Sequence, residues 1–303
     1  MLPNWLFTQS LVEHELSWLA AEHVDPGGRV APEVLAALRG SALRTAVLPT
    51  WLGGHGQQWE QVGRGLSALG SVCPATAWLA HEHLATLYRL AHATGGGPAL
   101  AGVVERAALL AERDATAVEI GEAVVVTWPR VTAPAIRTVA ALDGLPSTVT
   151  PALSTRGYVI RAALASAAIN GVATDLLRRI ATAGHAPPRP LGAAVTQLLT
   201  SQAATFRGLS MLDTLTMAGE ASDGAISAAF HTTVRGGVRA LLASLEALLD
   251  RTDGLDDEPF AWLPVVLRAM ARHPVLDDES WDDRVTASLS GDWTLFDELA
   301  TPS

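Results

Sequence analysis

Two histidines flank a glutamate inside a predicted helix: His81, Glu82 and His83. Successive residues of an α-helix are rotated by about 100°, so the two imidazoles point about 200° apart and cannot bind one metal ion together. Helical metal motifs place their two histidines four residues apart. We therefore expect no metal site here. The three residues fit a polar, partly exposed helix end, which we favour, or a helix face that lines a ligand cavity.

Other polar side chains lie in apolar stretches further along the chain. His231 follows Phe230 in an alanine-rich stretch. It fits a core histidine, slightly favoured, or an acid or base that reaches a cavity. Arg207 and Asp213 lie in another apolar stretch. Because buried charges need partners, we expect these two to pair across helices or subunits rather than to act in catalysis.

A glycine-rich loop, Gly53-Gly54-His55-Gly56, lies between Trp51 and Trp59. The chain has nine tryptophans but only two tyrosines and five phenylalanines, so tryptophan provides most of its large aromatic area. We favour core packing for these rings. The alternative is an aromatic-walled ligand pocket that includes Trp51.

Hydrophobic periodicity predicts the elements that must position these residues. The pattern is helical, then turns to short β-branched runs separated by Gly and Pro, and then becomes helical again. We expect a mainly α fold with an N-terminal helical domain at 1–114, a reduced β segment at 115–157 and a C-terminal antiparallel helical bundle at 158–303. The clearest helices are predicted at 57–69, 74–92, 162–183, 191–218 and 223–249.

Composition excludes several classes of function. The 303 residues include 31 Asp and Glu against 21 basic residues, all of them arginine, for a net charge of -10. An acidic chain without a basic run is a poor nucleic-acid binder, and the lack of lysine excludes Schiff-base and Walker A chemistry. Cys73 is the single cysteine, so no internal disulfide can form. No signal peptide and no apolar run of membrane-spanning length is evident, so we expect a cytoplasmic protein.

Several segments carry a resemblance to a known family. They are Leu43–Pro49 followed by Gly53–Gly56, then Gly65–Leu69 with Pro74–His83, and Pro190-Leu191-Gly192 with Gln197. Their pattern and order resemble the acyl-CoA dehydrogenase superfamily. The resemblance implies that family's fold, with the helix from residue 74 lining the acyl pocket.

The resemblance also implies site residues. Thr76, Leu79, Ala80 and Trp51 would contact the substrate. His83 would be the first acid or base candidate, because the pKa of free histidine is near neutral, and His231 the second. No cofactor-binding residue can be assigned.

The departures from the family bear on the cofactor. The flavin-holding "TEPxxGSD" and "WItN" stretches and the late "GGxGY" are absent, and Trp128-Pro129 is the nearest remnant. We therefore predict an enzyme of bacterial specialised metabolism that has lost its flavin. It would perform acid/base or ring-forming, cyclase-type chemistry on a small molecule. The alternatives are an FAD-dependent oxidoreductase, of dehydrogenase or monooxygenase type, and a non-catalytic ligand-binding or partner subunit.

The long C-terminal helices are apolar around much of their girth, and such helices must be buried. We predict a homodimer or homotetramer assembled through residues 190–250, as in the resembled family. The expected partners are a small-molecule substrate and further copies of the chain, with no nucleic acid and no membrane.

Overall fold

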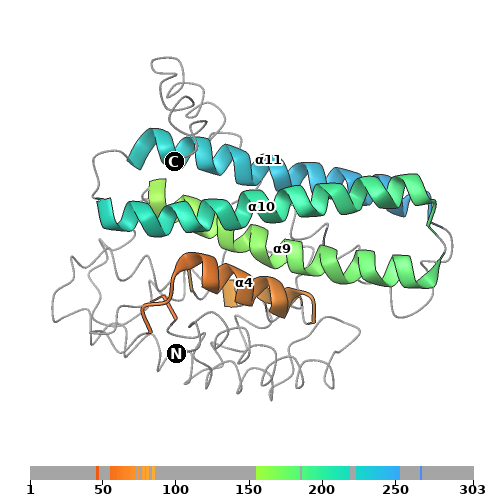
Figure 1. Ribbon diagram of the computed structural model, residues 1–303, viewed down its shortest axis with the longest axis horizontal. Helices are drawn as coiled ribbons and strands as arrows, with labels where there is room; N and C mark the ends of the chain where they lie inside the picture. The colour runs from red at the N-terminus through yellow and green to blue at the C-terminus, as the bar shows by residue number, and fades with distance from the viewer. Residues whose placement is uncertain are drawn as a thin grey trace, which may run out of the picture.

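The computed structural model describes residues 46–47, 55–72, 74, 77–78, 80–81, 84–85, 155–184, 186–218, 223–252 and 267. In this part of the chain four helices are complete: α4 (Trp59–Gly70), α9 (Thr155–Ala183), α10 (Pro188–Ala218) and α11 (Asp223–Leu249) (Figure 1). These residues contain no strand. The mainly α expectation is confirmed for them, while nearly all of the predicted β segment lies outside the described residues.

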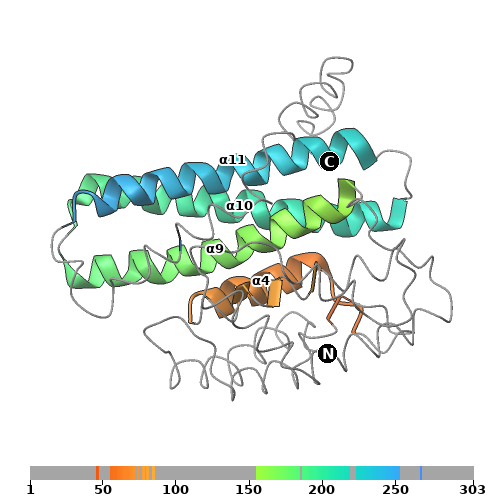
Figure 2. The same ribbon diagram turned by 180° about the vertical axis from the view of Figure 1, so that it is seen from behind.

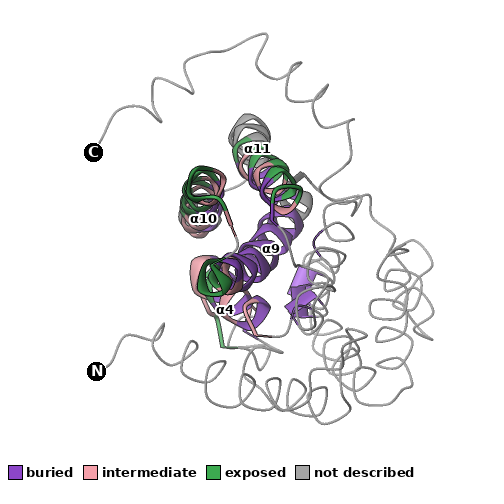
Figure 3. Ribbon diagram, turned by 90° about the vertical axis from the view of Figure 1, so that its right-hand side faces the viewer, coloured by how far each residue is buried: buried purple, intermediate pink, exposed green. Residues whose placement is uncertain are grey.

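The three long helices run antiparallel in sequence order. α9 and α10 are joined by a short turn at one end of the bundle, and α10 and α11 are connected at the other end, as Figures 1 and 2 show from opposite sides. α4 lies along the bundle and contacts both α9 and α10. α9 contacts α4, α10 and α11, so it forms the centre of the assembly (Figure 3).

Burial follows from this central position of α9. Every described side chain of α9 from Val159 to Ala173 is buried. The span Val159–Ala183 is apolar and long enough to cross a membrane, and 94% of its most apolar window is buried inside the protein. A helix that is apolar all round belongs in a core, and α9 has that place here. α10 and α11 differ, because each also has an exposed face.

Local sequence signals explain where these helices end. α9 stops at Gly184, which has φ +72 and so occupies the left-handed conformation that follows many helices. α10 begins at Pro188, three residues before the predicted start at Leu191. Prolines are tolerated in a first turn because the N–H groups that they lack have no helical partner there.

Most of the other predicted bounds agree with the structure, but α9 begins seven residues before the predicted residue 162. α11 has the predicted bounds, and α4 begins two residues later than the predicted residue 57. α9 begins at Thr155, so residues 155–157 are helical rather than the end of the β segment. In the predicted helix 74–92, the described residues are helical and buried: Pro74, Ala77, Trp78, Ala80, His81, Leu84 and Ala85.

α4 and α9 pack at backbone distance through small residues. A Cβ added to Gly171 would stand 2.0 Å from the carbonyl oxygen of Ser67, and one added to Gly70 would stand 2.5 Å from that of Ala168. Real Cβ atoms do not approach so closely. Glycine is therefore required at this crossing for the two helices to touch.

Candidate functional site

The first turn of α4 is held by a side chain from α10. The Asp213 carboxylate accepts hydrogen bonds from the backbone N–H of Trp59 at 2.7 Å and of Glu60 at 3.2 Å. The first N–H groups of a helix have no partner inside it, so Asp213 supplies a cap from a distant part of the chain. Asp213 thus pairs across the bundle, as expected, but with backbone amides. Arg207, which was also expected to pair across helices or subunits, is exposed.

The position of Asp213 also affects its protonation. Burial raises the pKa of Asp213 above its ordinary value, and the negative charge of Glu60 adds to that effect. The two hydrogen bonds from Trp59 and Glu60 act in the opposite direction because they stabilise the charged form. Glu60 is itself paired with Arg64 at 2.7 Å, and the Arg64 guanidinium lies over the Phe206 ring of α10 at 4.6 Å.

His81 and Trp78 form a buried pair in the helical segment after α4. Both side chains are 0% exposed, and their ring centroids lie 4.6 Å apart. His81 Nδ1 lies 3.2 Å from the carbonyl oxygen of Trp78. A carbonyl can only accept, so Nδ1 carries the proton and a neutral ring has its lone pair on Nε2. The expectation of a partly exposed position is therefore wrong for His81, which packs in the core.

The predicted site residues fall mostly outside the described part of the chain. Thr76, Leu79, His83 and Trp51 are not among the described residues. His231 lies on α11, in the part of that helix whose side chains the structure does not describe. Ala80 is described and is 1% exposed, within the hydrophobic core. The roles assigned to these residues remain predictions.

A buried polar cluster joins α9 to α10, and the sequence analysis missed it. The Asn170 amide accepts a hydrogen bond from Ser201 Oγ at 2.8 Å through Oδ1 and donates one to Thr205 Oγ1 at 3.2 Å through Nδ2. All three side chains are 0% exposed. One turn further along α9, Gln202 donates to Thr174 at 3.2 Å. The sequence signal for this cluster was Asn170, a lone amide in an alanine-rich stretch of α9. Ser201 and Thr205, four residues apart on α10, provide the matching hydroxyl groups.

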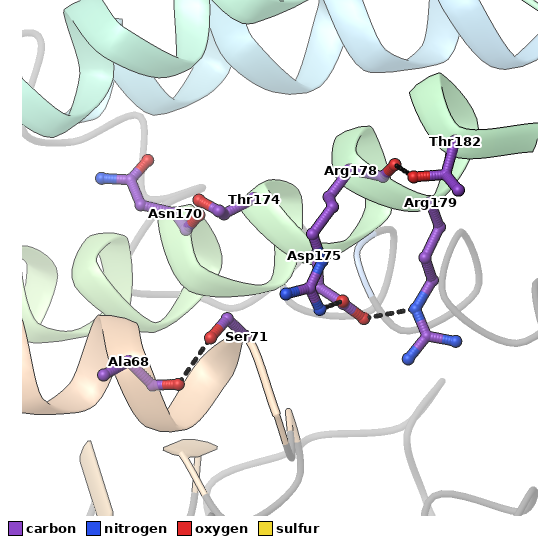
Figure 4. Close-up of polar contacts among 8 residues, drawn as sticks. All are labelled: Ala68, Ser71, Asn170, Thr174, Asp175, Arg178, Arg179 and Thr182. Carbon is purple, nitrogen blue, oxygen red and sulfur yellow. Dashed lines mark hydrogen bonds and ion pairs between the residues drawn. The ribbon is translucent and has the colours of Figure 1, made fainter. Parts of the chain in front are cut away.

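A second polar cluster lies near the end of α9 (Figure 4). Asp175 has a side chain only 5% exposed and pairs with two arginines of its own helix, with Arg179 Nε at 2.7 Å and with Arg178. Arg178 is 68% exposed. In the described ranges no three His, Cys, Asp or Glu side chains gather as metal ligands. The two arginines neutralise the buried carboxylate, so the cluster satisfies a charge rather than forming a metal site.

Comparison with solved structures places these helices in a known architecture. XiaF from Streptomyces sp., in complex with FADH2 and glycerol, superposes with a TM-score of 0.67 at 15% identity, over 98% of this chain and 98% of that chain. The HsaA monooxygenase from M. tuberculosis gives 0.62 at 13% identity, over 95% and 99%. The chain has an acyl-CoA-dehydrogenase-like fold. This confirms the predicted fold class. No protein-family model and no curated protein matches the sequence.

α4 packs closely against both α9 and α10. A Cβ at Gly63 of α4 would stand 2.3 Å from Leu209 Cδ1 of α10, and α4 meets α9 at backbone distance. At these contacts no flavin ring can lie between α4 and the two long helices.

Proposed function

We propose that the protein is a flavin-dependent oxidoreductase, of monooxygenase or dehydrogenase type, that acts on a small organic molecule. The observation that carries this proposal is the similarity to XiaF and HsaA over nearly the whole chain. One of these proteins is in complex with FADH2, and the other is a monooxygenase. The sequence analysis had the opposite order, with a flavin-free enzyme first and an FAD-dependent oxidoreductase as the alternative.

The described helices suit a scaffold for such an enzyme. α9 packs against α4 at the crossing of Gly70 and Gly171, and it is hydrogen-bonded to α10 through Asn170. Asp213 of α10 binds the backbone at the start of α4. A rigid framework holds reacting groups in a productive geometry. The ligand would lie between the helix that includes Trp78 and the long helices, and His83 remains the first candidate for an acid or base there.

The proposal keeps two further expectations from the sequence. The enzyme would be cytoplasmic and would act without a membrane. It would also act without nucleic acid, because the chain is acidic and has no basic run.

Titration with flavin tests the proposal directly. Purified protein is mixed anaerobically with FADH2, and in parallel with FAD, and binding is followed by flavin absorbance and tryptophan fluorescence. We expect saturable binding of at least one redox form. The amount of flavin oxidised or reduced for each molecule of organic substrate converted would then define the reaction type.

A second candidate is supported by the absent "TEPxxGSD" and "WItN" stretches. In this case the scaffold performs acid/base or ring-forming chemistry without a flavin. Protein that binds neither FAD nor FADH2 in the titration would overturn the first proposal and favour this one. Turnover by the protein alone would then separate an enzyme from a non-catalytic subunit.

A further inference from the structure

The buried stripe of α10 repeats along the helix. Its members follow one another every three or four residues, which is the helical repeat, and all of them are at most 7% exposed: Ala194, Leu198, Ser201, Thr205, Leu209 and Leu212. α9 is itself rich in alanine, with six buried alanines between positions 162 and 173. Apolar shape alone therefore distinguishes poorly between two registers of α10 on α9 that differ by one turn, about 5.4 Å.

The Asn170 amide of α9 breaks this repetition. It lies between two hydroxyls of the stripe, because Ser201 Oγ donates to its Oδ1 at 2.8 Å and its Nδ2 donates to Thr205 Oγ1 at 3.2 Å. The next members of the stripe on either side are Leu198 and Leu209. If α10 slipped by one turn in either direction, one of these leucines would replace a hydroxyl partner of the amide. A buried polar group that loses its hydrogen bond disfavours such a register by a factor of about 5–100.

Other polar contacts of α10 depend on the same register. Gln202 Nε2 donates to Thr174 Oγ1 of α9 at 3.2 Å, and the Asp213 carboxylate accepts a bond from the backbone N–H of Trp59 at 2.7 Å. A slip of one turn, about 5.4 Å along the axis, would take both pairs out of hydrogen-bond reach. Asp213 therefore caps α4 only in the register in which Asn170 meets its two hydroxyls.

We propose that Asn170, together with Ser201 and Thr205, selects the register of α10 on α9. Buried polar groups can specify the register of packed helices while adding little to stability or even lowering it. A chain without the cluster would then still fold into stable helices but would populate more than one register. This role belongs to the scaffold, so it does not depend on whether a flavin binds.

Disulfide trapping on the full chain measures the register directly. In a Cys73→Ser background, Thr174→Cys is combined in turn with Gln202→Cys, Leu198→Cys or Phe206→Cys. The first pair reports the register of the structure, in which the native side chains are hydrogen-bonded. The other two pairs report a slip of four residues in one direction or the other. Oxidation with copper phenanthroline, followed by peptide mapping of the monomer, gives the rate at which each disulfide forms.

The comparison is made with the cluster present and absent. With Asn170, Ser201 and Thr205 in place, the 174–202 disulfide should form at least about tenfold faster than the 174–198 and 174–206 disulfides. In N170L/S201A/T205V, one of the two slipped disulfides should form at a rate comparable to that of 174–202. Far-UV circular dichroism and urea unfolding show that each variant is folded.

Ser166→Ala is the matched control. Ser166 is a buried hydroxyl of α9 that donates to the carbonyl oxygen of Ala162 in its own helix at 2.8 Å, so its removal should leave the wild-type pattern unchanged. The exchange N170S/S201N moves the amide to α10 and a hydroxyl to α9. It should keep the single register, because an amide still meets a hydroxyl across the two helices.

A folded N170L/S201A/T205V chain that is trapped only through 174–202 would overturn the proposal. Slipped disulfides in Ser166→Ala would do the same, since the loss of any buried hydroxyl would then be enough. If the triple variant does not fold, the exchange N170S/S201N decides: trapping only through 174–202 supports the selection of register, and slipped disulfides in the folded exchange variant refute it.

Discussion

The carboxylate of Asp213 on α10 accepts a 2.7 Å hydrogen bond from the backbone N–H of Trp59, a residue 154 positions earlier that begins α4. The neighbouring N–H of Glu60 binds the other carboxylate oxygen at 3.2 Å. A side chain from α10 thus accepts hydrogen bonds that a side chain at the N-cap position of α4 itself would usually accept. This contact couples the start of α4 to α10.

Removing this cap should destabilise the fold. Asp213→Ala is expected to lower the free energy of unfolding by about 1 kcal/mol, the usual cost of losing an N-cap. Asp213→Asn should cost less, because its oxygen can still accept one of the two bonds. Urea unfolding followed by circular dichroism measures both. Asp250→Ala, at an exposed aspartate on the turn that follows α11, is the control and should change the stability little.

The protonation of Asp213 should appear in the pH dependence of stability. Burial raises its folded-state pKa, so the folded protein binds this proton more tightly than the unfolded chain does. The stabilisation from this tighter proton binding is complete at pH values below the unfolded-state pKa of about 3.9. It is lost as the pH rises through the folded-state pKa. The stability of wild type minus that of Asp213→Asn should therefore fall over this window and level off above it. A difference that rises with pH would show that the hydrogen bonds outweigh burial.

Two glycine substitutions should have opposite effects. Gly171→Ala places a Cβ 2.0 Å from the Ser67 carbonyl oxygen, so α4 and α9 must move apart, at a cost of about 1–3 kcal/mol. Gly236→Ala, inside α11 with no atom within 4 Å of the new Cβ, should stabilise by about 0.5–1 kcal/mol. Thermal and urea unfolding of the pair give the comparison. Equal effects would mean that the close approach at Gly171 is absent in solution.

The Asn170 cluster should tolerate complete replacement better than partial removal. Asn170→Ala leaves the buried hydroxyls of Ser201 and Thr205 without their amide partner and should cost about 1–3 kcal/mol. The triple variant N170L/S201A/T205V removes the polar groups together and should recover part of that loss. Chemical denaturation of the two variants tests this. A triple variant less stable than Asn170→Ala would contradict the assignment.

The predicted acid or base is testable in any turnover assay. His83→Ala should lower turnover by roughly 10²–10⁴-fold if His83 transfers a proton in the reaction. His231→Ala tests the second candidate. His55→Ala, at an exposed loop histidine, is the control and should keep full activity. Full activity of folded His83→Ala would remove His83 from the mechanism.

The sequence alone determined the class of the fold, both limits of α11 and the C-terminal limits of α9 and α10. α11 has the predicted bounds, and α9 ends where Gly184 stops it. These features are local, because hydrophobic periodicity, glycine and proline act within a few residues. The predicted start at Leu191 left out the first turn of α10, which contains Pro188 and Pro190, although a first turn accepts proline.

Only the tertiary structure decided what the polar side chains do. Asp213 was expected to meet a charge and instead meets two amides of α4, and His81 was expected near the surface but is buried on Trp78. Asn170 drew no attention in the sequence, yet it joins two helices. The partner of a polar side chain lies on another helix, so its identity depends on the crossing of α4, α9 and α10. That crossing is set by close contacts such as Gly171 against Ser67, which no local pattern encodes.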